Sequence, residues 1–269
     1  LLLREGLCRL FGHGDPTHCI LTCGNTMGLN MVLRGWLRPG DHCLVSAVEH
    51  NAVMRPLQDL AAEGVSFDRI PCDSAGRLDA GAVEGMIRPN TRLLVMAHGS
   101  NVSGAVQDAQ AVGDVCRRRG VPFVLDAAQT AGHWPIDFEK LGLSALSVPG
   151  HKGLMGPSGT GALLLSKDFA GQLRPIVTGG TGSASDEEVQ PPYMPDRFES
   201  GTPNLPGIYG LQAAVDFVLS KGVETFRDHE TALTARFLSK LRSIPHVRLA
   251  GPWDLEDRVG VVSLDFETV

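Results

Sequence analysis

Short, almost wholly apolar runs alternate along the chain with longer segments of helical periodicity. Bounded by turn residues, the apolar runs predict strands at Thr17–Cys23, His42–Val48, Val65–Ile70, Arg92–Ala97, Pro122–Asp126, Ala145–Val148 and Gly161–Ser166. Helices are predicted at Leu1–Phe11, Met27–Leu37, Val53–Glu63, Asp79–Ile87 and Gln110–Arg119. Apolar strands that alternate with helices are typical of an α/β fold, in which a mainly parallel sheet is covered by helices on both faces.

The pattern changes between Thr178 and Pro206, where Gly, Ser, Pro and acidic residues dominate without periodicity. Such a long segment inside a compact domain is typical of a functional or disordered region. Helical patterns resume at Gly207–Leu219 and Val223–Arg242, and strand patterns follow at Val247–Leu249 and Val259–Phe266. We therefore predict a large domain over residues 1–220 and the start of a smaller α+β domain over residues 221–269.

Composition and charge narrow the class of protein. The 269 residues are 43% hydrophobic and 20% charged, which is typical of a soluble globular protein, and the net charge of −6 argues against nucleic acid or an anionic membrane as a partner. No apolar stretch approaches the roughly 20 residues that span a bilayer. The six cysteines are widely spaced and predict free thiols in a reducing, cytoplasmic compartment. Because the chain opens in a helical pattern without Met and stops in a strand pattern, we expect a fragment that lacks the N-terminal segment of its large domain.

Polar side chains follow most of the predicted strands. The sequences at these points are Gly24-Asn25-Thr26, Glu49-His50-Asn51, His98-Gly99-Ser100-Asn101, Asp126-Ala127-Ala128-Gln129 and Gly150-His151-Lys152. Open parallel sheets bind their ligands at the carboxyl ends of the strands. We therefore expect these residues to share one site.

The chemistry of these residues indicates pyridoxal 5'-phosphate (PLP). A helix that begins after Gly24 and carries Thr26 offers N–H groups to a phosphate. Asp126 at a buried strand end suits a protonated ring nitrogen, and Lys152 between two glycines suits imine formation. Phosphate site, carboxylate and lysine are together what PLP requires. A metal site built on the nearby histidines and Asp126 is not expected, because Lys152 would oppose the cation.

Each of these residues alone has a simpler interpretation. Gly24-Asn25-Thr26 could be an ordinary helix cap, His50 a histidine that satisfies a helix start, Asp126 a turn former and Lys152 a solvated surface charge. Their joint position after successive strands is what favours a cofactor site.

As a set, the motifs resemble the cysteine desulfurase and selenocysteine lyase group of class V aminotransferase-like, fold-type I PLP enzymes. The resemblance covers essentially the whole chain. It rests on Gly24-Asn25-Thr26, Glu49-His50-Asn51-Ala52-Val53, Ser100-Asn101-Val102-Ser103-Gly104, Asp126-Ala127-Ala128-Gln129-Thr130, Gly150-His151-Lys152, Gly156-Pro157-Ser158-Gly159-Thr160-Gly161 and Arg197-Phe198-Glu199-Ser200-Gly201-Thr202-Pro203-Asn204. The fold that it implies is the large domain of the PLP-dependent transferases.

The resemblance implies a role for each matching residue. The catalytic residues would be Lys152, which holds PLP as a Schiff base and moves protons at the substrate Cα, Asp126, which pairs with the ring nitrogen, and His50, which stacks on the ring. The other cofactor-binding residues would be Asn25, then Thr26 and His151, which with nearby backbone N–H groups bind the phosphate, Asn101 and Gln129 near the ring hydroxyl, and Thr202, which reaches the phosphate of the partner subunit. Such enzymes are homodimers with shared sites.

The function implied is conversion of L-cysteine to L-alanine, with sulfur passed to an enzyme Cys and then to a possible sulfur-acceptor protein. In the family the nucleophilic Cys and the Arg for the substrate carboxylate lie later in the chain, so we expect both beyond Val269. An aminotransferase, a selenocysteine lyase, another β-lyase or a catalytically incomplete fragment remain alternatives.

Some residues depart from the family pattern or compete for the missing roles. Pro149 replaces a phosphate-binding Ser and removes a hydroxyl donor. Cys19, Cys23 and Cys43 are expected to be packed within strands, and Cys116 precedes three arginines that could lower its pKa. Cys72 is the closest rival nucleophile, and Arg197 is the only nearby candidate for the substrate carboxylate.

Overall fold

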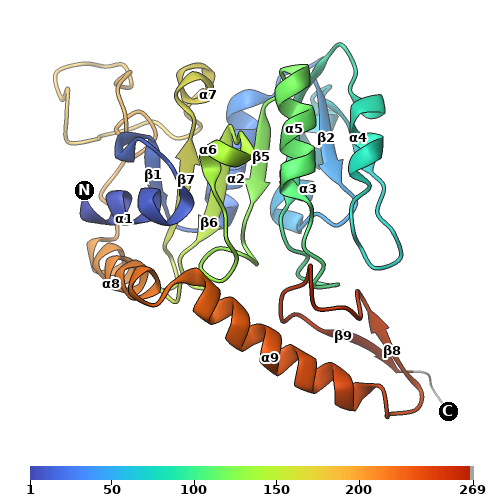
Figure 1. Cartoon of the computed structure of the whole chain (residues 1–269). Helices are drawn as coiled ribbons and strands as arrows, with labels where there is room; N and C mark the ends of the chain where they lie inside the picture. The colour runs from blue at the N-terminus through green and yellow to red at the C-terminus, as the bar shows by residue number, and fades with distance from the viewer. Residues whose placement is uncertain (267–269) are drawn as a thin grey trace.

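A seven-stranded sheet forms the centre of the computed structural model, which describes residues 1–266 (Figure 1). The strands are β1 (Cys19–Thr22), β2 (His42–Ser46), β3 (Ser66–Ile70), β4 (Thr91–Ala97), β5 (Phe123–Asp126), β6 (Ala145–Pro149) and β7 (Gly161–Leu165). They lie in the order β1-β7-β6-β5-β4-β2-β3. Only β7 of these strands is antiparallel to both of its neighbours, so the carboxyl ends of the other six lie along one edge of the sheet.

Helices cover both faces of this sheet. They are α1 (Leu2–Phe11), α2 (Asn25–Trp36), α3 (Asn51–Ala62), α4 (Ala80–Met86), α5 (Ala109–Arg119), α6 (Phe138–Leu141), α7 (Lys167–Gln172), α8 (Leu205–Lys221) and α9 (Val223–Leu241), with a short 3-10 turn at Pro16–His18. Residues of α1, α5 and α8 form one buried apolar cluster, and residues of α2, α3 and α7 form another. Because the inner strands supply side chains to both clusters, they are mostly apolar, whereas the edge strand β3 also carries Ser66, Asp68 and Arg69 and is largely unburied.

The fold class predicted from the sequence is confirmed. The predicted strands and the larger helices are present, with ends displaced by a few residues. The short helices α6 and α7 were not predicted, and the last strand is shorter than expected, since β9 spans Ser263–Phe266 and pairs with β8 (Val247–Ala250). No helix within residues 1–266 is long and apolar enough to cross a membrane.

The aperiodic segment between α7 and α8 contains no helix or strand, as predicted, but its last part is held by specific contacts. Glu199 forms a two-point ion pair with Arg4 of α1, with both N···O distances 2.7 Å. The same carboxylate accepts the N–H of Leu21 in β1 at 2.6 Å. The segment therefore lies against the β1 end of the sheet, where it can take part in a site.

The C-terminal part packs against a loop that follows β4. Gly222 separates α8 from α9, close to the predicted domain boundary, and α9 leads below the sheet to the β8–β9 hairpin (Figure 1). Buried Arg258 donates hydrogen bonds to the main-chain oxygens of Pro252, Val259 and Val261. The Val259 N–H in turn donates to Gly104 O at 2.9 Å. The division into domains at residue 220 stays a prediction, but these contacts tie the C-terminal part to the large sheet.

Gly104 shows how closely the two parts approach. Its φ of +76° lies in the left-handed region, and an added Cβ would lie 2.5 Å from the oxygen of Val261. Only glycine fits between the C-terminal segment and the Asn101 loop, which we define as residues 99–106.

We expect Arg258→Met to destabilise the protein by about 3 kcal/mol, because three buried carbonyl groups would lose their donor. Chemical denaturation followed by circular dichroism would measure the change. Arg236→Met is the matched control, since Arg236 lies exposed on α9, and it should shift the unfolding free energy by less than about 0.5 kcal/mol. Equal stability of the two variants would contradict the role given to Arg258.

Candidate functional site

A cavity of about 370 Å³ lies at the carboxyl ends of the strands, a volume suited to a small cofactor. Eight of the nine residues predicted to bind the cofactor line it: Asn25, Thr26, His50, Asn101, Asp126, Gln129, His151 and Lys152. Cys23, Met27, Ala97 and Pro149 also line it. The ninth, Thr202, lies in a neighbouring hollow. Residues far apart in the sequence thus meet because their strands end at the same edge.

The N-terminus of α2 opens into this cavity. Gly24 is the N-cap residue of α2, so the simpler interpretation as a helix cap holds, but no side chain of the cap hydrogen-bonds to the first turn. N–H groups at the start of α2 are therefore left without a side-chain partner. With the positive end of the helix dipole, they form an anion site.

Asp126 is 2% exposed at the end of β5. Its Oδ1 accepts hydrogen bonds from Asn25 Nδ2 at 2.7 Å and from the Ala128 N–H at 2.9 Å. Burial raises the pKa of Asp126 despite these bonds and the nearby charge of Lys152, so the depressed pKa expected for a paired carboxylate is not found in the protein alone. A cation against this carboxyl group would favour its charged form.

His50 and Asp126 have structural roles as well as places in the cavity. His50 Nδ1 accepts the N–H of Ala52 at 3.0 Å, which caps α3, and Asp126 stabilises the turn that follows β5 through Ala128. Both simpler interpretations therefore hold locally. Both side chains nevertheless line the same cavity as exposed Lys152.

Buried His98 lies beside the cavity rather than in its wall. Its Nδ1 lies 3.0 Å from the hydroxyl of Thr130, and burial lowers its pKa to about 4, so it is neutral. Within residues 1–266, no three side chains of His, Cys, Asp or Glu come together in a way that could hold a metal ion.

The sequence-based prediction overlooked the carboxyl group of Glu49. Its Oε1 accepts hydrogen bonds from the Ser46 hydroxyl at 2.5 Å and the Ala97 N–H at 2.7 Å. Burial, with a smaller contribution from the charge of Asp126, raises the pKa of Glu49 to about 8. Its position just before His50 was the available signal, but a sequence does not show that an acidic side chain turns inward.

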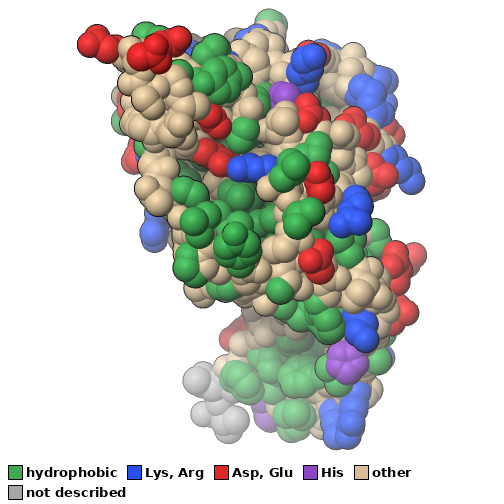
Figure 2. All heavy atoms as spheres, turned by 90° about the vertical axis from the view of Figure 1, so that its left-hand side faces the viewer, with side chains coloured by type: hydrophobic (Ala, Val, Ile, Leu, Met, Phe, Trp, Pro, Cys, Tyr) green, Lys and Arg blue, Asp and Glu red, His purple; other side chains and the backbone are tan. Residues whose placement is uncertain are grey.

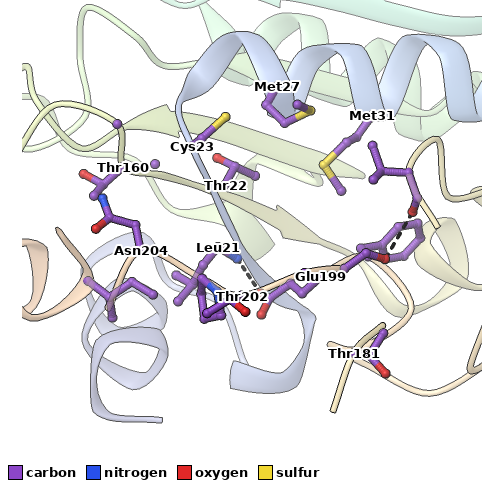
Figure 3. A pocket seen from close by; sticks show the side chains of 18 of the residues that line it. Leu21, Thr22, Cys23, Met27, Met31, Thr160, Thr181, Glu199, Thr202 and Asn204 are labelled. Atoms are coloured by element: carbon purple, nitrogen blue, oxygen red, sulfur yellow. Dashed lines mark hydrogen bonds between the residues drawn. The ribbon is translucent and has the colours of Figure 1, made fainter. Parts of the chain in front are cut away.

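A second hollow adjoins the cavity on the side of β1 (Figure 3). Cys23 and Met27 line both spaces, and Thr202 and Glu199 line the hollow from the segment before α8. Because Thr202 lines this hollow and not the cavity, it lies beside the cavity of its own chain but not in it.

Hydrophobic side chains gather on the face of the molecule that carries α1, with charged groups around them (Figure 2).

The cysteines differ from expectation at two positions. Cys23 was expected to pack within a strand, but β1 ends at Thr22 and Cys23 is exposed where the chain turns into α2. The three arginines after Cys116 could have lowered its pKa, but burial raises that pKa to about 12. Buried Cys43 also has a raised pKa, as does half-buried Cys72.

Arg197 is engaged elsewhere. Its guanidinium donates to the main-chain oxygens of Leu173 at 2.9 Å and Gly171 at 3.3 Å. It does not line the cavity, so it is not placed to bind a substrate carboxylate there.

Comparison with known proteins agrees with this geometry. The family model "Aminotransferase class-V" matches residues 3–269. A probable cysteine desulfurase from Methanothermobacter thermautotrophicus is 31% identical over 262 residues, which are 96% of this chain and 65% of that protein. The chain thus spans slightly less than two thirds of this relative's length.

Two solved structures share the fold. The apo structure of a cysteine desulfurase from Thermococcus onnurineus has a TM-score of 0.90 and 30% identity, over 99% of this chain and 68% of the other. A structure described as C-DES with glycine covalently linked to its PLP cofactor has a TM-score of 0.83 and 27% identity, over 99% of this chain and 72% of the other. The chain belongs to the aminotransferase class-V family, in which it is similar to cysteine desulfurases.

Proposed function

We propose that this chain is the cofactor-binding part of a PLP-dependent cysteine desulfurase, which converts L-cysteine to L-alanine and transfers the sulfur to an enzyme thiol. The observation that carries the proposal is that the open N-terminus of α2, Asp126 and Lys152 all face one cavity. The similarity to cysteine desulfurases supports the choice of reaction.

The residues present fit PLP. Asn25 Oδ1 is buried beside Asp126 and has no hydrogen-bond partner within residues 1–266, so it can accept a donor that a bound ligand supplies. Both hydrogen bonds to Asp126 go to Oδ1, so Oδ2 accepts none from the described residues and can face a ring nitrogen. PLP, when bound, supplies an electron sink that stabilises negative charge at the substrate Cα.

The side chains would divide the work as follows. Lys152 Nζ would bind the cofactor covalently and later carry a proton to or from the substrate Cα. The Asp126 carboxylate would keep a proton on the ring nitrogen, and the His50 imidazole would lie against the ring face. Near the phosphate, the N–H groups of α2 would act with Thr26 and His151. Asn101 and Gln129 would bind the ring hydroxyl.

Sulfur transfer requires a mobile, exposed thiolate that attacks the substrate sulfur and then releases it to an acceptor. We place this thiol, and an arginine for the substrate carboxylate, beyond residue 269. Within the described residues only Cys23 borders the cavity among the cysteines, and it does so beside the anion site.

Another class V reaction, such as transamination, selenocysteine lysis or a β-elimination, is the second candidate. One observation favours keeping it: Cys23 is the only cysteine among the residues that line the cavity in the described part of the chain, and it lies beside the anion site. The residues that line the cavity therefore fit these reactions as well as desulfuration.

Thr202 and the hollow that it lines lead us to propose a homodimer with shared sites, in a cytoplasmic enzyme that passes sulfur to an acceptor protein. Thr202 is exposed next to, but outside, the cavity of its own chain. In a symmetric dimer it would reach the phosphate of the other subunit.

Borohydride reduction of the full-length protein with PLP, followed by peptide mapping, should place the pyridoxyl group on Lys152. Lys167→Ala is the control, because Lys167 lies at the start of α7 outside the cavity. In this variant Lys152 should be labelled as in the wild type. Labelling of another lysine in the native protein would refute the assignment.

Asp126→Asn should stabilise the cofactor-free protein at alkaline pH while weakening PLP binding. Since the pKa of Asp126 is raised on folding, the wild type loses stability as pH rises from the unfolded pKa of about 4 through the folded pKa, and the Asn variant does not. Denaturation at several pH values should therefore show an advantage of Asp126→Asn that grows as pH rises above the unfolded pKa of about 4. Exposed Asp186→Asn should show no such trend.

Mixing Lys152→Ala and Thr202→Ala subunits should restore one tight, covalent PLP site per heterodimer. If Thr202 acts across the interface, one site of the mixed dimer carries both defects and the other carries neither. Absorbance titration of purified heterodimers would count the sites. Thr181→Ala, which alters the same hollow, is the control and should bind PLP in its homodimer like the wild type. Heterodimers without a tight site would show that Thr202 acts within its own chain.

A further inference from the structure

Glu49 is a carboxyl group enclosed behind the wall of the cavity. Its Oε2 has almost no accessible surface and no hydrogen-bond partner within residues 1–266. Its Oε1 receives two donors, the Ser46 hydroxyl and the Ala97 N–H. Glu49 does not line the cavity, so any effect on the cofactor must pass through its neighbours.

The hydrogen bond from the Ala97 N–H to Glu49 lies just beyond the point where main-chain pairing between β2 and β4 stops. Strands β2 and β4 pair in parallel up to Val45 and Val95. Beyond that point the Ala97 N–H meets the Glu49 carboxyl group in place of a β2 carbonyl. On its other side Ala97 is in register with Asp126 of β5. Glu49, Ala97 and Asp126 thus form a row across the ends of three strands.

Two residues next to Glu49 line the cavity. The Ala97 N–H donates a hydrogen bond to the Glu49 carboxyl group, and His50 follows Glu49 directly in the chain. His50 caps α3 through the Ala52 N–H, so the turn between β2 and α3 is fixed at both ends, by Glu49 and by this cap. The position of the His50 imidazole therefore depends on the hydrogen bonds that fix the Glu49 carboxyl group.

The groups that act electrostatically on Glu49, or on which it acts, are Asp126 on β5, the Cys43 thiol on β2 and the Cys72 thiol after β3. Both thiols have raised pKa values and stay neutral, and they bring no positive charge. Burial raises the pKa of Glu49 to about 8, so the acid form predominates near neutral pH. Asp126 then has no second carboxylate beside it.

We propose that Glu49 is a positioning residue that, as a neutral acid, holds His50 and Ala97 in the wall of the cofactor cavity and leaves Asp126 as the carboxylate for the ring nitrogen. This inference rests on the proposed PLP site. Oε1 accepts the two hydrogen bonds and Oε2 carries the proton. An amide has the same shape and the same acceptor, so glutamine can replace this group.

The test compares Glu49→Gln and Glu49→Ala in the full-length protein. PLP affinity and the visible circular dichroism of bound PLP report on the cavity. Glu49→Ala should bind PLP on the order of tenfold more weakly, with an altered dichroism band, because two hydrogen bonds that fix the wall are lost. Glu49→Gln should stay within about threefold of the wild type, with an unchanged band.

A second readout concerns the proton and needs no cofactor. Because folding raises the pKa of Glu49 from its usual value to about 8, the wild type should lose stability as pH rises from about 5 to about 8. Glu49→Gln should lack this part of the loss, so its denaturation midpoint should rise relative to the wild type over that range. Exposed Glu63, at the end of α3, is the matched control, and Glu63→Gln should show neither effect.

The outcomes separate the two proposals. Wild-type protein without PLP on Lys152 would refute the proposed function, whereas wild-type and Glu49→Ala proteins with equal affinity and dichroism would refute only the role of Glu49. If Glu49→Ala does not fold, Ser46→Ala, which removes one donor, should weaken PLP binding by a few fold while Glu49→Gln does not. Loss of PLP affinity in Glu49→Gln, or a flat difference between its stability and that of the wild type across this pH range, would overturn the neutral-acid assignment.

Discussion

The common direction of six strands is the constraint on which the rest of this structure depends. Since β7 is the only reversed strand of the large sheet, the carboxyl ends of the others meet at one edge. The N-terminus of α2, the turn before α3 and the segment after β5 therefore open into the same cavity. Both faces of the sheet are covered by helices, so this edge is where polar groups of the strand connections can gather.

Burial at that edge sets the charge of two carboxyl groups. Asp126 and Glu49 lie on either side of Ala97, and burial raises the pKa of both. Two adjacent buried carboxylates would be costly, and a proton on Glu49 relieves that cost. Asp126 is thereby free to pair with a cation supplied by a ligand. A buried carboxylate without a cation beside it lowers the stability of the empty protein, and a bound cationic group relieves that cost. Functional sites commonly reduce stability in this way.

Segments distant in sequence complete the surroundings of the cavity. Glu199 binds both Arg4 of α1 and the main chain of β1, so the segment that carries Thr202 is fixed next to the hollow. At the other end, Arg258 and Gly104 join the C-terminal part to the Asn101 loop. The cavity is consequently held from two directions by residues that do not line it.

The alternation of apolar strands and helices determined the fold class, because a strand that is buried on both faces must carry apolar side chains on both. The motifs after the strands likewise determined which side chains would meet, since parallel strands end together. The sequence alone could not show that Glu49 turns inward, that β1 stops before Cys23 and leaves it exposed, or that Arg197 is bound to main-chain oxygens. These features depend on contacts with Ala97, with the start of α2 and with residues at the end of α7, and only the tertiary structure brings such partners together.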